Sequence, residues 1–326
     1  MKASFVTRIM HRSGFAVAMT AVALAGIVVF YFTGSTVRID GDRGFALLSA
    51  NEWIPSPFAD MFASIAANAL VMVLLTLILK SSNILRSTTR LPLAMFAVMQ
   101  LATPSLAVQF YTGTLLCLTV TACVALTFTC YRAPWRTRRV FLIFFALSLG
   151  TATQYSFAIY MPVFLAGCAQ MRIFNRRTLL AALLGVITPW WILAGFGIVD
   201  LTALEMPRFE SIFSIIDYSG TVLLLSAAGL TALLSLTAFA AASVKAIAYN
   251  ARTRAFNGLF AVLTLVSVVA MVADYRNFIV YLPTLNLCAA YQTAHYFTVY
   301  RGERTWIGIA SVCTLYIFIF VCQTVM

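Results

Sequence analysis

Two aspartates separated by a single glycine, Asp40 and Asp42, follow the first long apolar segment of the chain. Their carboxylates can converge on one cation, or one of them can act as a general base toward an acceptor hydroxyl. Arg38 and Arg43 flank the pair, and a guanidinium suits phosphate because it donates two parallel hydrogen bonds. A solvated turn is the plainer interpretation, since Asp and Gly are common turn formers. The cluster therefore indicates either a phosphate-handling site or a turn.

A second ionisable pair, Asp274 and Arg276, lies between two apolar segments. Ionisable residues at membrane depth often mark functional sites, although pairing with each other at the headgroup level would also account for them. The following segment carries Asn286, Gln292 and His295. Gln292 and His295 are three residues apart and share one helix face, so we expect them to hydrogen-bond to a neighbouring helix.

These residues belong to a chain of 326 residues, of which 62% are hydrophobic and 10% charged. A soluble domain carries about a quarter charged residues, so the solvent of this chain must be lipid. Only helices and closed barrels satisfy the backbone in lipid, and the apolar runs here continue for about 20 residues without the alternation of barrel strands. The predicted fold is all-α: a polytopic transmembrane helical bundle, with residues 1–326 forming a single integral membrane domain and no soluble domain.

We predict about eleven membrane segments, at residues 14–33, 57–79, 91–106, 110–130, 140–151, 155–170, 178–197, 219–242, 257–273, 277–297 and 305–325. The segments at 140–151 and 155–170 are short and only three residues apart. They are expected to form a hairpin, either spanning or re-entrant, that returns to the face it entered from. Pro104 is expected to break the third segment.

The charged residues sort between the two faces that these segments define. With the N-terminus in the cytoplasm and the C-terminus outside, 18 of the 22 basic residues lie inside and nine of the ten acids lie outside. The basic half follows the positive-inside rule and predicts a multi-pass inner-membrane protein, with its basic residues in short loops rather than on a nucleic-acid-binding surface. Carboxylates contribute little to orientation, so the acidic half directs attention to the outer face.

Several other chemistries find little support in the sequence. Its only two histidines, His11 and His295, are both expected on the cytoplasmic side, away from the acids. The seven cysteines fall inside apolar runs without ligand spacing, so they indicate packing residues rather than a zinc site or disulfides. No nucleotide-binding glycine motif is present. The one cofactor that the pattern accommodates is a divalent metal ion at the aspartate pair.

The position of Asp40 and Asp42 resembles the C-type glycosyltransferase superfamily, whose polytopic enzymes carry a modified acidic pair in the first outer loop after helix one. The middle of the chain is also similar to that superfamily's short-helix region and cytoplasmic turn. The similar parts are the stretch from Ser148 to Ser156, the apolar run through Pro162, the basic turn from Arg172 to Arg177, and the helix that ends near Pro189-Trp190-Trp191. The likeness covers roughly residues 14–197. The chain lacks the large C-terminal outer domain that many members have.

This resemblance implies a membrane glycosyltransferase of the cell envelope, which uses a polyprenyl-phosphate-linked sugar at the periplasmic face. Asp40 or Asp42 would act as base or bind a metal, and Arg276, with Arg38 or Arg43, would hold the phosphate. A second resemblance, to uncharacterised polytopic membrane proteins of Bacteroidota, is carried by residues 83–92 and by 274–278 through Leu282-Pro283. It implies no activity.

Two alternatives remain open beside the enzyme. The broken helices and the polar residues at 286, 292 and 295 favour a transporter or flippase of lipids or small solutes. A non-catalytic scaffold of an envelope assembly complex would need no outer cavity lined by acids. Membrane lipids are the expected partners in each case.

Overall fold

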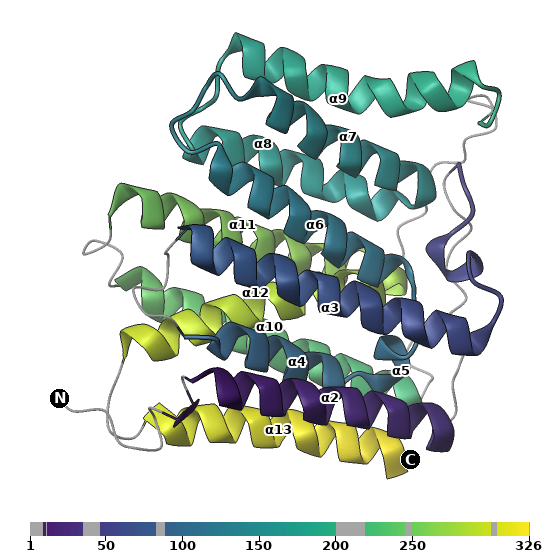
Figure 1. The fold of residues 1–326 in the computed structure, drawn as a ribbon, viewed down its shortest axis with the longest axis vertical. Coiled ribbons are helices and arrows are strands. Elements are labelled where there is room, and N and C mark those ends of the chain that lie inside the picture. The colour runs from purple at the N-terminus through teal and green to yellow at the C-terminus, as the bar shows by residue number, and fades with distance from the viewer. Residues whose placement is uncertain are drawn as a thin grey trace.

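The computed structural model describes residues 9–10, 12–34, 46–82, 89–199, 219–244, 250–300 and 305–325, and no strand occurs among them. Helices packed side by side make up the molecule (Figure 1). Their bounds are α2 Ser13–Thr33, α3 Pro57–Ser82, α4 Leu91–Leu101, α5 Pro104–Ala107, α6 Thr112–Thr129, α7 Thr137–Thr153, α8 Met161–Gln170, α9 Arg176–Gly195, α10 Ser219–Val244, α11 Ala251–Ala273, α12 Phe278–Val299 and α13 Thr305–Val325. Short 3-10 helices are η1 Ala50–Glu52, η2 Tyr155–Tyr160 and η6 Tyr275–Asn277.

Within these described ranges, seven helices are long and apolar enough to cross a membrane: α2, α3, α6, α9, α10, α11 and α13. The prediction of a multi-pass, all-helical membrane protein is therefore confirmed. The shorter segments also take the form that the sequence indicates. Helix α4 ends at Leu101 and α5 starts at Pro104, which is the predicted break. Residues 137–170 form a hairpin of α7 with η2 and α8.

Helix α12 is the centre of the bundle. Of its 22 residues, 18 are buried, and it contributes to the two largest hydrophobic clusters. One cluster joins it to α6, α7, α8 and α11, and the other joins it to α2, α3, α4 and α13. Because its neighbours shield α12 from lipid, this helix can carry polar residues that a lipid-facing helix could not.

A proline inside α12 is accommodated by a contact from α6. Pro283 has no N–H, so the carbonyl of Ile279 lacks its partner within the helix. The hydroxyl of Tyr111, at the start of α6, donates a hydrogen bond to that carbonyl over 3.2 Å. This bond fixes α6 against the first turn of α12.

Helices α7 and α9 approach each other closely at Gly185. A Cβ placed there would lie 2.7 Å from the backbone oxygen of Phe141 and 2.9 Å from the Cβ of Phe144. One turn away, the hydroxyl of Ser148 donates to the carbonyl of Val186 over 2.6 Å. A glycine is required at residue 185 because the backbone of α7 occupies the space of a side chain.

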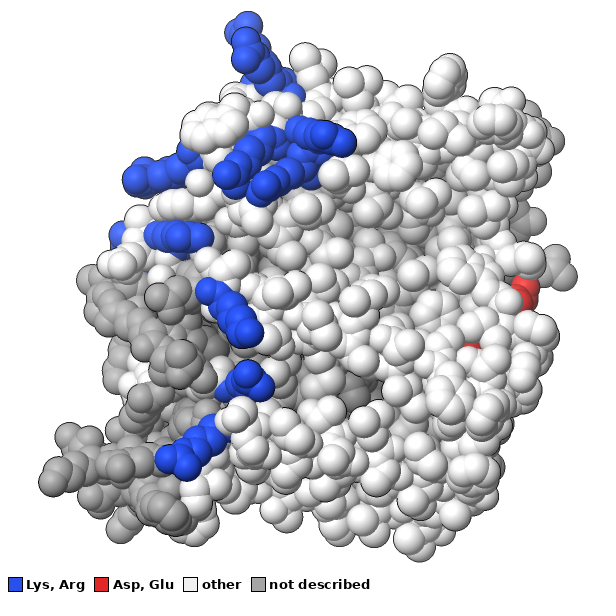
Figure 2. All heavy atoms as spheres, in the orientation of Figure 1, with Lys and Arg blue, Asp and Glu red and all other residues white. Residues whose placement is uncertain are grey.

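The charged residues occupy opposite ends of the bundle (Figure 2). We call one end the basic end; it carries Arg12, Lys80, Arg90, Arg132, Arg136, Arg138, Arg139, Arg172, Arg176, Arg177, Arg252 and Arg254. The other, the acidic end, carries Glu52, Asp60 and Asp274, together with Arg276. The described residues thus repeat the charge separation that the sequence predicts.

Candidate functional site

Four of the five predicted site residues, Arg38, Asp40, Asp42 and Arg43, lie outside the described residues. Their convergence stays a prediction. The described chain resumes at Ala46, and the backbone N–H groups of Ala46 and Leu47 both donate to the carbonyl of Ala152, at 2.9 and 2.8 Å. Residues 46–48 are not helical. The fifth residue, Arg276, is described and lies in η6 at the acidic end.

Asp274 lies at the junction of α11 and η6 and is fully buried. One of its carboxylate oxygens, Oδ2, accepts hydrogen bonds from the hydroxyls of Tyr155 and Tyr281, each at 2.8 Å. The other, Oδ1, accepts from the amide of Asn277 at 3.1 Å, and the same amide donates to the Tyr155 hydroxyl at 2.6 Å. A buried carboxylate with three donors is compensated for the water it has lost. The cluster holds η2 against the corner between α11 and α12.

Arg276 differs from this cluster in exposure, although it is only two residues from Asp274. Its side chain is exposed, whereas Asp274 and Asn277 are buried. The 3-10 turn of η6 places these neighbours in different surroundings. Arg276 is therefore exposed at the surface of the acidic end, where the resemblance to the glycosyltransferase superfamily implies a phosphate-binding arginine.

An apolar groove of about 310 Å³ lies between α10 and α11 and ends at η6. Its floor and walls are aliphatic, and two aromatic rings, Tyr275 and Phe278, close it at the acidic end. These rings stack with centroids 5.5 Å apart. Gly229 on α10 leaves open space, because a Cβ there would meet nothing within 4 Å. The residues lining the groove are Leu225, Ala228, Gly229, Ala232, Val268, Met271, Val272, Tyr275 and Phe278.

The groove and Arg276 together have the composition of a site for an amphiphile. An acyl or prenyl chain gains about 0.8 kcal/mol for each CH₂ that it buries against such a wall. Arg276 lies in sequence between the two aromatic residues that close the groove, and an exposed guanidinium there suits an anionic headgroup. A lipid phosphate satisfies both requirements at one place.

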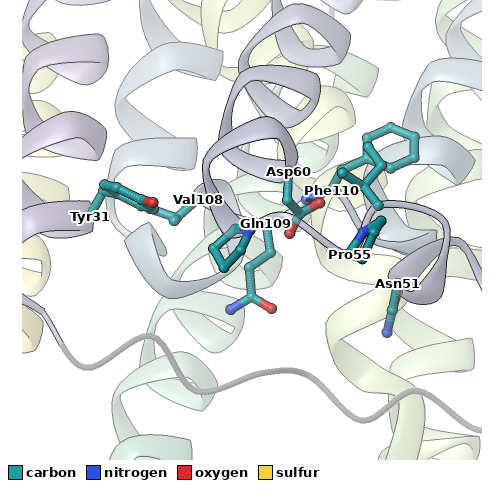
Figure 3. Close-up of a pocket in the computed structure, with 9 residues that line it drawn as sticks. Tyr31, Asn51, Pro55, Asp60, Val108, Gln109 and Phe110 are labelled. Atoms are coloured by element: carbon teal, nitrogen blue, oxygen red, sulfur yellow. Dashed lines mark hydrogen bonds between the residues drawn. The ribbon is translucent and has the colours of Figure 1, made fainter.

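A smaller pocket of about 210 Å³ opens at the same end (Figure 3). Its lining comes from α2, from the segment around η1, from the start of α3 and from the α5–α6 turn: Tyr31, Asn51, Ile54, Pro55, Pro57, Asp60, Val108, Gln109 and Phe110. The pocket is below the ~300 Å³ of sites for drug-sized ligands. The aromatic rings of Tyr31 and Phe110 can pack against the C–H groups of a sugar, and the amides of Asn51 and Gln109 can hydrogen-bond to its hydroxyls. The pocket therefore suits a ligand of about one sugar ring.

The polar residues of this pocket also shape it. Asp60 accepts a hydrogen bond from the backbone N–H of Phe110 at 3.0 Å. Asn51 accepts from the N–H of Thr112 at 3.1 Å, which satisfies one of the free amides at the start of α6. Ser64 adds a bond from its hydroxyl to the carbonyl of Ala107 at 2.7 Å. The pocket is thus held by side chains that bind the backbone of the α5–α6 turn.

Two polar residues of α12, Gln292 and His295, face a neighbouring helix as predicted, and that helix is α11. The amide of Gln292 donates to the hydroxyl of Thr264 at 2.9 Å, and Nε2 of His295 lies 3.2 Å from Nδ2 of Asn257. Both partners are on α11, which confirms that Gln292 and His295 share one face. Asn286, on another face, is buried, and neither atom of its amide has a partner among the described residues.

The aromatic partners of Asp274 are the residues that sequence reasoning missed. Tyr155 is 119 residues away from Asp274 along the chain, and no local pattern connects the two. The only signal was the position of Tyr155 at the tip of the predicted hairpin. In the part of the chain that the structure describes, no group of three or more His, Cys, Asp or Glu residues could hold a metal ion.

Comparison of the chain with models of known protein families, with curated protein sequences and with solved structures found no match.

Proposed function

We propose that this protein is a multi-pass inner-membrane glycosyltransferase that uses a polyprenyl-phosphate-linked sugar at the periplasmic face. In this proposal the basic end is cytoplasmic and the acidic end periplasmic, in accordance with the positive-inside rule. About eleven segments then cross or enter the membrane: the seven long helices, α4 with α5, α7, η2 with α8, and α12.

The observation that carries the proposal is the apolar groove that ends at η6, the short helix that contains Arg276. A polyprenyl phosphate needs an apolar channel for its chain and a cation for its phosphate at the membrane surface. The smaller pocket at the same end is a candidate for the sugar. Asp40 or Asp42 would serve as the base for the acceptor hydroxyl or bind a divalent metal, and Arg38 or Arg43 would assist with phosphate.

Lipid binding tests the groove directly. The purified protein in nanodiscs is titrated with a polyprenyl phosphate and with the neutral polyprenol, and complexes are counted by native mass spectrometry. Arg276→Gln should weaken binding of the phosphate about tenfold or more and leave the polyprenol unchanged, since a hydrogen bond to a charged group contributes about 1.5–3 kcal/mol.

A second variant tests the groove wall. Gly229→Leu places a side chain into the groove and should weaken both lipids, whereas Gly195→Leu is the matched control, because Gly195 is also an exposed helical glycine with nothing within 4 Å of its Cβ position. Equal binding by wild type, Arg276→Gln and Gly229→Leu would remove the support for a lipid-phosphate site.

Transfer itself is measured in membranes that receive a radiolabelled polyprenyl-phosphate sugar. Asp40→Asn and Asp42→Asn should abolish the incorporation of sugar into envelope glycan while lipid binding and protein level stay normal. Full incorporation by the double variant contradicts the enzymatic proposal.

A second candidate is transport of a lipid or small solute, and the specific observation in its favour is Asn286. Its amide lies midway along α12 and is buried with both atoms unused among the described residues, as expected for a group that meets a passing solute or water. Dithionite quenching of a fluorescent lipid in proteoliposomes separates the candidates. Movement of the lipid between leaflets, lost in Asn286→Leu, supports transport.

A further inference from the structure

A line of buried and partly buried polar side chains runs through the bundle between α11, α12 and the η2 segment. We call it the polar seam. Its members are Tyr155, Ser156 and Tyr160 on η2; Asn257, Thr264, Ser267 and Asp274 on or just after α11; and Asn277, Tyr281, Thr284, Tyr291, Gln292 and His295 on or just before α12. None of these residues lines the apolar groove or the smaller pocket.

The polar seam is long enough to join the two faces of a membrane. Along α12 its members recur every three or four residues, at 277, 281, 284, 291 and 295, apart from one longer step, so they lie on one helix face. Between Asn277 and His295 the helix rises about 27 Å, which compares with a hydrocarbon core of about 30 Å. Asp274 begins the seam at the acidic end, and His295 ends it one turn from the end of α12.

Three hydrogen-bonded groups follow one another along the seam. The first is Asp274 with Tyr155, Tyr281 and Asn277, described above. In the second, the hydroxyls of Tyr160 and Ser267 are 2.8 Å apart.

The third group lies toward the basic end. There Gln292 binds Thr264, and the Tyr291 hydroxyl donates to Oδ1 of Asn257. That bond leaves Nδ2 of Asn257 to donate to Nε2 of His295. In this arrangement Nε2 is the accepting ring nitrogen and carries no proton.

Unused polar atoms occur along the seam. Oε1 of Gln292 is buried and has no hydrogen-bond partner among the described residues, and the buried hydroxyls of Ser156 and Thr284 face the hydroxyls of Tyr281 and Tyr160 without completing a well-aligned bond. Leaving such atoms unpaired costs about 1–3 kcal/mol each, and buried water is their usual partner. A seam that served only to join helices would pair its polar atoms with one another.

We propose that the polar seam is hydrated and conducts protons across the membrane between Asp274 and His295. A carboxylate at one end, an imidazole at the other and hydroxyls between them are the groups that proton relays use. This inference does not depend on glycosyl transfer, and it assigns a function to residues that the lipid site does not use.

The relay balances without any co-reactant. A proton from the acidic end binds a carboxylate oxygen of Asp274. Each hydroxyl or water oxygen along the seam then accepts one proton and releases another, so only O–H bonds form and break. For the last transfer a seam water replaces the Asn257 amide at Nε2 of His295; that water gives a proton to Nε2, and the ring then releases a proton toward the basic end. The membrane potential supplies the driving force, about 2.3 kcal/mol for each charge per 100 mV.

Proton flux into proteoliposomes tests the proposal. The full-length protein is reconstituted with pyranine trapped inside, and valinomycin with a potassium gradient imposes an inside-negative potential. The wild type should acidify the lumen faster than protein-free liposomes. Asp274→Asn and Tyr281→Phe should reduce the rate to the protein-free level, because the first removes the proton-binding carboxylate and the second removes a hydroxyl that carries the proton onward.

Two variants serve as matched controls. Tyr316→Phe removes an equally buried tyrosine hydroxyl, which binds Thr231 between α10 and α13, away from the seam. Thr293→Val removes a buried hydroxyl from α12 next to Gln292 but on the opposite face from Tyr291 and His295. Both should conduct at the wild-type rate. Thermal unfolding and size-exclusion profiles establish that the compared variants are folded.

Three results would overturn the proposal. The first is a wild-type rate equal to that of protein-free liposomes. The second is unchanged flux in Asp274→Asn and Tyr281→Phe, which would place the path elsewhere. The third is an equal loss of flux in Tyr316→Phe, which would show that the loss does not depend on residues of the seam. Lipid binding and sugar incorporation are measured separately, so none of these results bears on the glycosyltransferase proposal.

Discussion

The hydrogen bond from Tyr281 to Asp274 offers a direct measure of what the buried carboxylate does for the fold. Tyr281 and Tyr316 form a matched pair: both side chains are fully buried, and each hydroxyl bonds to a side chain on another segment, at 2.8 and 2.7 Å. The partners differ in charge, since Tyr281 binds a carboxylate and Tyr316 binds the hydroxyl of Thr231.

Replacement by phenylalanine should therefore destabilise the protein unequally. Loss of the Thr231 bond should cost about 0.6 kcal/mol, the typical value for an interhelical hydrogen bond in a membrane protein. Loss of the bond to Asp274 should cost about 1.5–2 kcal/mol, the lower part of the range for charged acceptors, because Tyr155 and Asn277 still bind the carboxylate. The difference between the two variants should be about 1 kcal/mol.

Reversible unfolding by SDS in mixed micelles, followed by far-UV circular dichroism, gives the two free energies under the same conditions. The reasoning is refuted if the two variants lose equal stability within about 0.5 kcal/mol, the usual limit of additivity. An equal loss would mean that Asp274 accepts no stronger a bond than a neutral hydroxyl does.

Three further predictions concern packing and orientation. Gly185→Ala should lower the free energy of unfolding by about 1–3 kcal/mol in the same assay, because its Cβ would overlap the backbone of α7. In the control variant Gly229→Ala the new Cβ meets nothing, so stability should stay the same or rise slightly. Equal effects of the two substitutions would show that the helices do not touch at residue 185. Tyr111→Phe should cost about 1–3 kcal/mol by leaving the proline-freed carbonyl of α12 unpaired, and an unchanged midpoint would contradict the contact. The orientation is tested in a cysteine-free background, where Trp53→Cys should react with an impermeant maleimide added outside cells and Trp135→Cys should react only after permeabilisation. The reason is that these two exposed residues lie at opposite ends of the bundle. The reverse labelling pattern would invert the proposed orientation.

The positions of the membrane segments could be read from the sequence because hydropathy is a local property. A run such as 305–325 is apolar over its whole length, and the structure forms α13 over the same residues. The break at Pro104 is equally local, since a proline cannot continue the preceding helix. The charge separation follows from the same segments, because their ends carry the basic and acidic residues (Figure 2).

Position within the bundle could not be read in this way. Sequence alone treats 277–297 as one more apolar segment, and only the fold makes α12 the central helix whose polar residues meet α11. The pairing of Tyr155 with Asp274 joins residues far apart in the chain, and so does the groove between α10 and α11. Hydrophobicity drives helices into the membrane but does not choose their neighbours there, because lipid is as apolar as the helices. The choice of neighbours belongs to close packing and to buried hydrogen bonds, which exist only once the helices have assembled.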